Sequence, residues 1–124
     1  MTEKPGKNAA PENLVLCGAN SYEEKYYFND QFGNLPQTVK DELQILCVLF
    51  TEEVGGILTL EFSPEGQLLF KTLVDDYDYY YDEIEAGVRI SRLRKEKQEL
   101  LEALELYYKT FFVDGSGSSG GSGQ

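Results

Sequence analysis

The clearest local pattern along the chain is an alternation of hydrophobic and polar positions over two neighbouring runs. In ILTLEF (57–62) Leu58, Leu60 and Phe62 share one face of a strand, while Thr59 and Glu61 share the other. This period of two is typical of a half-solvated antiparallel sheet. The next run, LLFKTLV (68–74), follows SPEGQ, whose proline and glycine fit a short hairpin loop. The two runs therefore predict a β-hairpin.

A second pair of β-favouring runs lies near the start of the chain. LVLC (14–17) and KYYF (25–28) are separated by GANSYEE. In that connection Gly18, Asn20 and Ser21 supply turn chemistry. A hairpin is the simplest interpretation.

Between the two hairpins the apolar positions change to helical spacing. Pro36 suits the first turn of a helix, and Gly55 with Gly56 ends it. Ile45, Val48 and Leu49 add apolar surface nearly all round, which predicts that the C-terminal half of this helix is covered on more than one side. The positions with helical spacing are Val39, Leu43, Leu46, Cys47 and Phe50.

The last predicted element is a long amphipathic helix from Asp82 to about Phe112, with Gly87 as its weak point. About 30 residues would span about 45 Å, which is the width of a small domain. The helix therefore bends or breaks near Gly87, or one end projects toward a partner. Its apolar seam either packs within the domain or forms a dimeric coiled coil. The candidate self-association face is Ile90, Leu93, Lys97, Leu100, Leu104, Tyr107 and Phe111.

These elements predict a ββαββα order and an α+β fold, in which an antiparallel sheet of about four strands packs on one buried helix and one long C-terminal amphipathic helix. We expect one domain at 13–114, a polar disordered leader at 1–12, and a Gly/Ser linker or tag remnant at 115–124. No run has the pattern of a signal peptide or a membrane span, so the expected compartment is the cytoplasm.

Four stretches resemble a family of short uncharacterised proteins from anaerobic, clostridial Firmicutes. The resemblance covers nearly all of 14–112 and implies a bacterial, cytoplasmic origin. It implies no activity, cofactor or catalytic residue. The stretches are LCGANSYEEKYYFN, LPQTVKDELQILCVLFTEEVGGILTLEF, DEIEAGVRI and ELLEALELYYKTFF.

The composition removes much of the usual site chemistry. The chain has no His and no Trp, and its formal net charge is -11. Cys17 and Cys47 lie in separate apolar runs and are expected to be core residues, with reactive thiols as the alternative. Zinc needs more His or Cys than this, and no twelve-residue calcium loop is present. We predict no metal and no cofactor.

Catalysis also finds little support in the sequence. No glycine loop suited to phosphate precedes a Lys-Ser/Thr pair, and Gly55-Gly56 follows a helix instead of opening one. Glu52 and Glu53 are adjacent, so on a helix they point in different directions. We predict no catalytic residue and no enzyme.

The segment DDYDYYYDEIE (75–85) carries six carboxylates, four tyrosines and no basic residue. It concentrates negative potential beside amphipathic rings that suit interfaces. In the alternative interpretation, Tyr79 and Tyr81 turn toward the core and the last carboxylates favour a helix N-terminus. The candidate partner-binding surface is Asp75, Asp76, Tyr77, Asp78, Tyr80 and Asp82.

Five basic residues follow at 89–97, where Glu96 is the only acidic one: Arg89, Arg92, Arg94, Lys95 and Lys97. The rest of the chain is so acidic that attraction of nucleic acid is implausible. We expect a solvated helix face with ion pairs such as Glu85 to Arg89 and Lys95 to Glu99.

Three classes of function follow from these observations. The first is an intracellular interaction or regulatory module that self-associates through its last helix. The second is an acidic inhibitor or immunity-type protein that neutralises a basic partner such as a nuclease toxin. A third, a ligand-binding domain or hydrolase, would need a concave pocket. The expected partner is a protein or a second copy, with no nucleic acid and no membrane.

Overall fold

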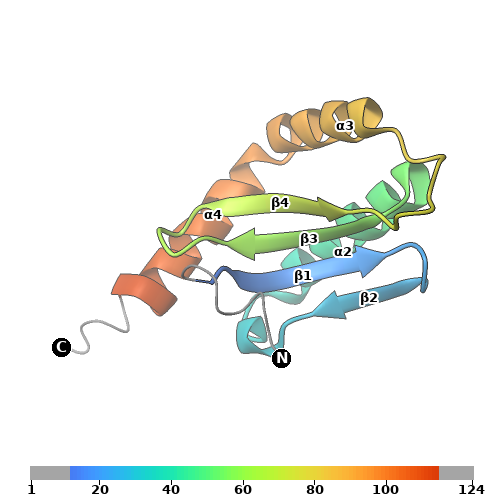
Figure 1. The fold of residues 1–124 in the computed structure, drawn as a ribbon. Coiled ribbons are helices and arrows are strands. Elements are labelled where there is room, and N and C mark those ends of the chain that lie inside the picture. The colour runs from blue at the N-terminus through green and yellow to red at the C-terminus, as the bar shows by residue number, and fades with distance from the viewer. Residues whose placement is uncertain (1–11, 115–124) are drawn as a thin grey trace.

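A four-stranded antiparallel sheet forms the centre of the molecule in this computed structural model, which describes residues 12–114. The strands are β1 (Leu14–Asn20), β2 (Lys25–Phe28), β3 (Ile57–Phe62) and β4 (Leu68–Leu73), in the spatial order β2-β1-β3-β4 (Figure 1). Both predicted hairpins are confirmed, although β1 continues through Gly18, which the sequence pattern assigns to the turn. They are joined by the pairing of β1 with β3, which the sequence pattern does not predict.

The α+β fold is also confirmed, because three helices accompany the sheet. They are α2 (Gln37–Val54), α3 (Glu83–Glu96) and α4 (Gln98–Tyr108), and a π-helical segment, η2 (Lys109–Asp114), continues α4. A short 3-10 helix, η1 (Asp30–Phe32), follows β2. The predicted Gly/Ser linker and, apart from Glu12, the predicted leader lie outside the described residues.

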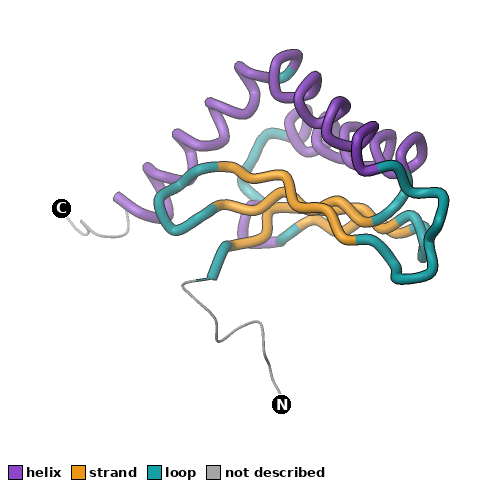
Figure 2. Tube along the Cα trace, turned by 45° about the horizontal axis from the view of Figure 1, so that its top comes forward, coloured by secondary structure: helices purple, strands orange, loops and turns teal. Residues whose placement is uncertain are grey.

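All three α-helices lie on one face of the sheet (Figure 2). The burial of β3 follows this arrangement, since Leu58, Leu60 and Phe62 are buried while the residues between them are half-buried. Aromatic rings that pack on one another form part of the core. Phe62 stacks on Tyr108 with ring centroids 4.3 Å apart, and Phe32 lies 5.5 Å from Phe62. The end of α4 is thereby fixed to the sheet.

The long C-terminal helix breaks at Lys97, and the expectation of a break near Gly87 is wrong. Gly87 lies inside α3, since a glycine in a helix interior costs only about 1 kcal/mol relative to alanine. Lys97 instead has φ -110° and ψ 23°, and caps α3 by donating its backbone N–H to the Leu93 carbonyl. Its Nζ lies 3.0 Å from Glu42 Oε2 on α2. The polar residue in the apolar seam therefore has its partner within the chain.

The expectation that α2 is covered on more than one side is also wrong. One face of the helix packs against the sheet, with Leu43, Leu46, Cys47, Phe50 and Thr51 buried. Ile45 and Leu49 on another face are exposed. Apolar composition alone does not show how many elements cover a helix.

The two cysteines are buried in the core, as predicted, and both are free thiols. Cys17 on β1 and Cys47 on α2 have their Sγ atoms 3.8 Å apart. Contact with Cys17 and burial together raise the pKa of the Cys47 thiol. The nucleophilic thiolate of Cys47 is therefore disfavoured.

The edge strand β4 is covered at its first residue by helix side chains. The Leu68 backbone N–H donates to Glu105 Oε2 on α4 at 2.8 Å. Its carbonyl accepts from Arg94 Nη2 on α3 at 3.3 Å. The Arg94 guanidinium also lies 4.8 Å from the centre of the Phe70 ring. Such cover at the edge of a sheet prevents pairing with other strands at that point.

Candidate functional site

The acidic tyrosine loop, defined here as residues 75–82, connects β4 to α3. It lies at the same end of the sheet as the turn between β1 and β2, as Figure 1 shows on its right side. Hydrogen bonds join these two segments, although they are more than 50 residues apart in sequence. The sequence-predicted partner surface falls entirely within this loop.

Several carboxylates of the loop bind its own backbone. Asp75 Oδ1 accepts from the Tyr77 backbone N–H at 3.2 Å, and Asp78 Oδ1 accepts from that of Tyr80 at 3.1 Å. Asp82 is the N-cap of α3, where its Oδ1 accepts from two backbone N–H groups, at 2.9 and 3.1 Å. These bonds satisfy donors that a turn or a helix start leaves unpaired. The acidic residues thus fix the conformation of the loop.

Tyr22 anchors the loop to the neighbouring turn. Its hydroxyl donates to Asp78 Oδ2 at 2.6 Å and accepts from the Asp75 backbone N–H at 3.0 Å. The hydrogen bond to the Asp78 carboxylate raises the pKa of the Tyr22 hydroxyl above its ordinary value. Because one hydroxyl binds both ends of the first loop turn, the two segments hold each other in place.

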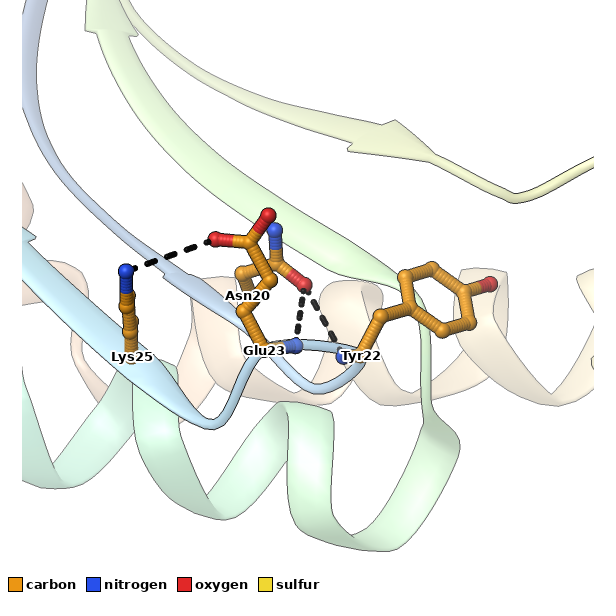
Figure 3. A network of polar contacts seen from close by, with 4 residues as sticks. All are labelled: Asn20, Tyr22, Glu23 and Lys25. Carbon is orange, nitrogen blue, oxygen red and sulfur yellow. Dashed lines mark hydrogen bonds and ion pairs between the residues drawn. The ribbon is translucent and has the colours of Figure 1, made fainter.

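The turn that carries Tyr22 is itself fixed by Asn20. Its Oδ1 accepts from the backbone N–H groups of Tyr22 and Glu23 at 2.9 and 3.1 Å (Figure 3). Lys25 Nζ lies 4.0 Å from Glu23 Oε1 on the other side of the turn. Figure 3 shows the Tyr22 ring pointing away from this ion pair.

A second anchor is the packing of Tyr81 against Gly56. Gly56 has φ +73°, which favours glycine, and a Cβ there would lie 2.9 Å from Tyr81 Cε1 and 3.2 Å from the Leu73 carbonyl oxygen. The Gly56 carbonyl also accepts from the Ser21 backbone N–H at 3.0 Å. The missing side chain lets the loop, the β1–β2 turn and the end of α2 meet.

The interpretation that Tyr79 and Tyr81 both turn toward the core is half right. The Tyr81 ring is half-buried and packs against the core, but Tyr79 is 81% exposed. The alternation fails because β4 ends at Leu73 and the chain turns at Asp75, where the Asp78 N–H donates to the Asp75 carbonyl. Side chains two residues apart share a face only in an extended strand.

The outcome is a fixed loop that presents three tyrosines to solvent. Tyr77 is 79% exposed and Tyr80 is 97% exposed, and Tyr79 lies between them. Asp75 and Asp76, which precede them in sequence, are exposed as well. A face of this kind suits a cation that is planar or has an apolar stem, because the ring faces attract positive charge and the carboxylates accept its hydrogen bonds.

We expect Tyr22→Phe to loosen the acidic tyrosine loop without unfolding the sheet. The change removes one hydroxyl, which bonds to Asp78 and to the Asp75 backbone, and keeps the ring. Hydrogen exchange measured by mass spectrometry should become faster in peptides covering 75–82 and stay unchanged in β3. Tyr27→Phe, on an exposed residue of β2, is the matched control. Equal exchange in the wild-type and Tyr22→Phe loops would show that the hydroxyl does not hold it.

Most of the predicted self-association face is used inside the chain. Leu104 is buried, and Ile90, Leu93, Leu100 and Tyr107 pack against the core as half-buried residues. Lys97 pairs with Glu42. Phe111 is exposed, with its ring centre 4.9 Å from that of Tyr107. The apolar spacing therefore marks the side of α3 and α4 that closes the domain core.

The basic run is largely exposed, as predicted, since Arg92, Arg94 and Lys95 are exposed and Arg89 and Lys97 are half-buried. Its ion pairs differ from the predicted ones. Arg89 forms an ion pair with Glu53 at the end of α2, where the sequence predicts a pair with Glu85 on the same helix. Arg94 lies over the Phe70 ring and donates to the Leu68 carbonyl at the start of the β4 edge. These cations link α3 to other elements. The i,i+4 rule describes neighbours on one helix, so it does not reveal such partners.

Among residues 12–114, no three His, Cys, Asp or Glu side chains are arranged to hold a metal ion. Within the same range no helix is long and apolar enough to cross a membrane.

Comparison with known proteins identifies a family for the chain. Residues 13–116 match the model of a family described as "Family of unknown function (DUF6145)". No curated protein and no solved structure matches the chain. The site is therefore interpreted from its own geometry.

Proposed function

The chain belongs to the DUF6145 family, whose function is unknown, and from its geometry we propose a non-catalytic protein-interaction module. Its acidic tyrosine loop binds a basic segment of a protein partner. The observation that carries this proposal is that the aspartates and the tyrosines of the loop have different roles. Asp75, Asp78 and Asp82 hold the backbone, while Tyr77, Tyr79 and Tyr80 extend into solvent.

Charge supports a basic partner. The segment 75–85 contains no basic residue, and the chain has a net charge of -11. A field of one sign accelerates encounter with a partner of the other sign and disfavours acidic partners. Arginine fits better than lysine, because its planar guanidinium stacks on aromatic rings and pairs with carboxylates through two hydrogen bonds.

The fixed conformation of the loop supports tight contact. Binding through a mobile loop loses affinity because the loop must be ordered. Here Tyr22 and Tyr81 hold both ends of the loop before a partner arrives. Tyrosine also offers a large contact area with few rotatable bonds, which is why binding loops use it often.

Docking of a basic partner is preferred over self-association through the last helix. The helix face from Ile90 to Phe111 is largely occupied by the core of its own chain. Inhibition of a basic protein, such as a nuclease toxin, is one form that the docking would take if the loop covered that protein's active site. The bacterial, cytoplasmic setting implied by the sequence resemblance is part of the same proposal.

The test is binding of a fluorescein-labelled peptide of nine arginines, followed by fluorescence polarisation. We expect Tyr77→Ala, Tyr79→Ala and Tyr80→Ala together to weaken binding about tenfold, since three cation–π contacts at exposed sites contribute about 0.5 kcal/mol each. Tyr27→Ala, which removes an exposed tyrosine from β2, is the matched control.

Two further comparisons sharpen this test. A peptide of nine lysines should bind more weakly than the arginine peptide, and both should weaken steeply as salt is raised. If the triple variant binds as tightly as the wild type, with the same salt dependence, the peptide is attracted by the acidic surface in general. That result would contradict the proposed site.

A further inference from the structure

The structure holds an open groove beside the acidic tyrosine loop, between the end of β4 and the start of α3. Its volume is about 380 Å³. Because it adjoins the loop at Val74 and Tyr81, a partner held by the loop would extend into it. The groove is lined by Thr72, Leu73, Val74, Tyr81, Glu83, Ala86, Gly87 and Ile90.

The backbone of β4 turns hydrogen-bonding groups toward the outside of the sheet along this groove. The hairpin closes with the Ser63 N–H donating to the Gln67 carbonyl. Leu68 then directs its N–H and carbonyl outward, to Glu105 and Arg94. In an antiparallel pair such outward groups recur at every second residue. Phe70 and Thr72 therefore also present theirs at the edge.

The cover over this edge is incomplete. Arg94 and Glu105 satisfy the outward groups of Leu68, but within residues 12–114 no hydrogen bond occupies those of Phe70 and Thr72. Leu73, at the end of the strand, is exposed. An unprotected strand edge is a template for another strand. Side chains therefore cover the backbone at the Leu68 end of β4, and the Thr72 end is accessible.

Two features describe the wall of the groove opposite β4. At Gly87 a Cβ would have no atom within 4 Å, so the missing side chain leaves open space above the helix. The Tyr81 hydroxyl is buried and has no hydrogen-bond partner within the described residues. A buried polar group is normally paired. Because the hydroxyl is buried, a peptide on the surface of the groove does not reach it, and strand addition rests on the open groove and the strand edge.

We propose that an extended, basic peptide segment binds here as an additional strand of the sheet, hydrogen-bonded to Phe70 and Thr72 and lying between β4 and α3. Peptides bind other sheets in this way, with main-chain bonds giving affinity and alternate side chains giving specificity. The basic character rests on the proposed function of the loop. The strand addition itself rests on the edge and the groove.

Charge favours such a peptide over a second copy of this chain. Glu83 lines the groove, and Asp75 and Asp76 follow β4 after Val74. Pairing of two β4 edges would bring two chains of net charge -11 together, and like charges oppose such contact. A strand with Arg or Lys at alternate positions places its charges beside these carboxylates.

The test uses a fluorescein-labelled octapeptide of alternating Arg and Val. We expect Gly87→Leu to weaken binding at least about tenfold, because the leucine fills the groove. The variant should fold, since leucine is a better helix former than glycine. Ser91→Leu puts the same side chain on an exposed position of α3 and is the matched control. A peptide N-methylated at every residue should also bind at least about tenfold more weakly, since it lacks every main-chain donor.

The outcomes separate the two proposals. If Gly87→Leu and N-methylation both leave binding unchanged, strand addition is wrong, whatever the tyrosine variant does. If the triple tyrosine variant binds normally while Gly87→Leu does not, the loop proposal fails and the groove stands. A concentration-dependent dimer that Gly87→Leu abolishes would overturn the inference, since the occupant would be a second copy.

Discussion

Leu104→Glu is expected to unfold the domain, whereas Leu106→Glu, two residues further along α4, should leave the melting temperature almost unchanged. Leu104 is 2% exposed and Leu106 is 66% exposed. The first change loses about 1.5–3 kcal/mol of apolar burial. It also places a carboxylate in the core, at a further cost of several kcal/mol. Together these approach the whole stability of a typical domain, about 5–15 kcal/mol.

The measurement is thermal unfolding by circular dichroism, combined with light scattering. It also separates the two uses of the last helix. A Leu104→Glu protein that stays folded but loses a dimer present in the wild type would support self-association through this helix face. Loss of the folded state in Leu104→Glu alone would assign that face to the core of the monomer.

Phe62→Ala is expected to cost about 3–5 kcal/mol of stability, the range for truncating a buried aromatic residue. Phe62 is fully buried on β3 and stacks on Tyr108 with ring centroids 4.3 Å apart. The ring centre of Phe32 lies 5.5 Å from that of Phe62 and 4.8 Å from that of Phe112 in η2. Removing one ring therefore leaves a cavity that three elements share.

Denaturant titration gives the loss of stability, and hydrogen exchange locates it. We expect the largest gain in exchange in η2 and the end of α4, because Phe62 links them to the sheet. Phe111→Ala, which removes an exposed ring from η2, should stay within about 0.5 kcal/mol of the wild type. A cost below about 1 kcal/mol for Phe62→Ala would show that the aromatic cluster contributes little.

Much of the fold follows from the sequence, because local patterns reflect which face of each element is buried. The alternation in β3 and the loop chemistry before β4 predict that hairpin closely. The pairing of β1 with β3 does not follow, since alternation identifies the buried face of a strand but not its neighbours. The break at Lys97 does not follow either, since the ion pair of Lys97 with Glu42 joins two helices and periodicity along one helix does not reveal it.

The candidate site shows the same limit. Composition alone identifies 75–85 as unusual, but it does not separate the aspartates that hold the loop from the tyrosines that face solvent. That separation depends on Tyr22, which lies 53 residues before Asp75. The exposed position of Tyr79 likewise depends on where β4 ends. A sequence signal existed only for Asp82, as a helix N-cap.

The central position of β1 governs the order in which this protein can be built. Its main partner, β3, enters the chain only after the whole of α2. A two-stranded hairpin is marginally stable at best in water, so β1 and β2 remain a transient unit until β3 arrives. Pairing across such a sequence distance is slow. During synthesis on the ribosome, the N-terminal half therefore waits for the second hairpin, and completion of the sheet becomes a late, cooperative event.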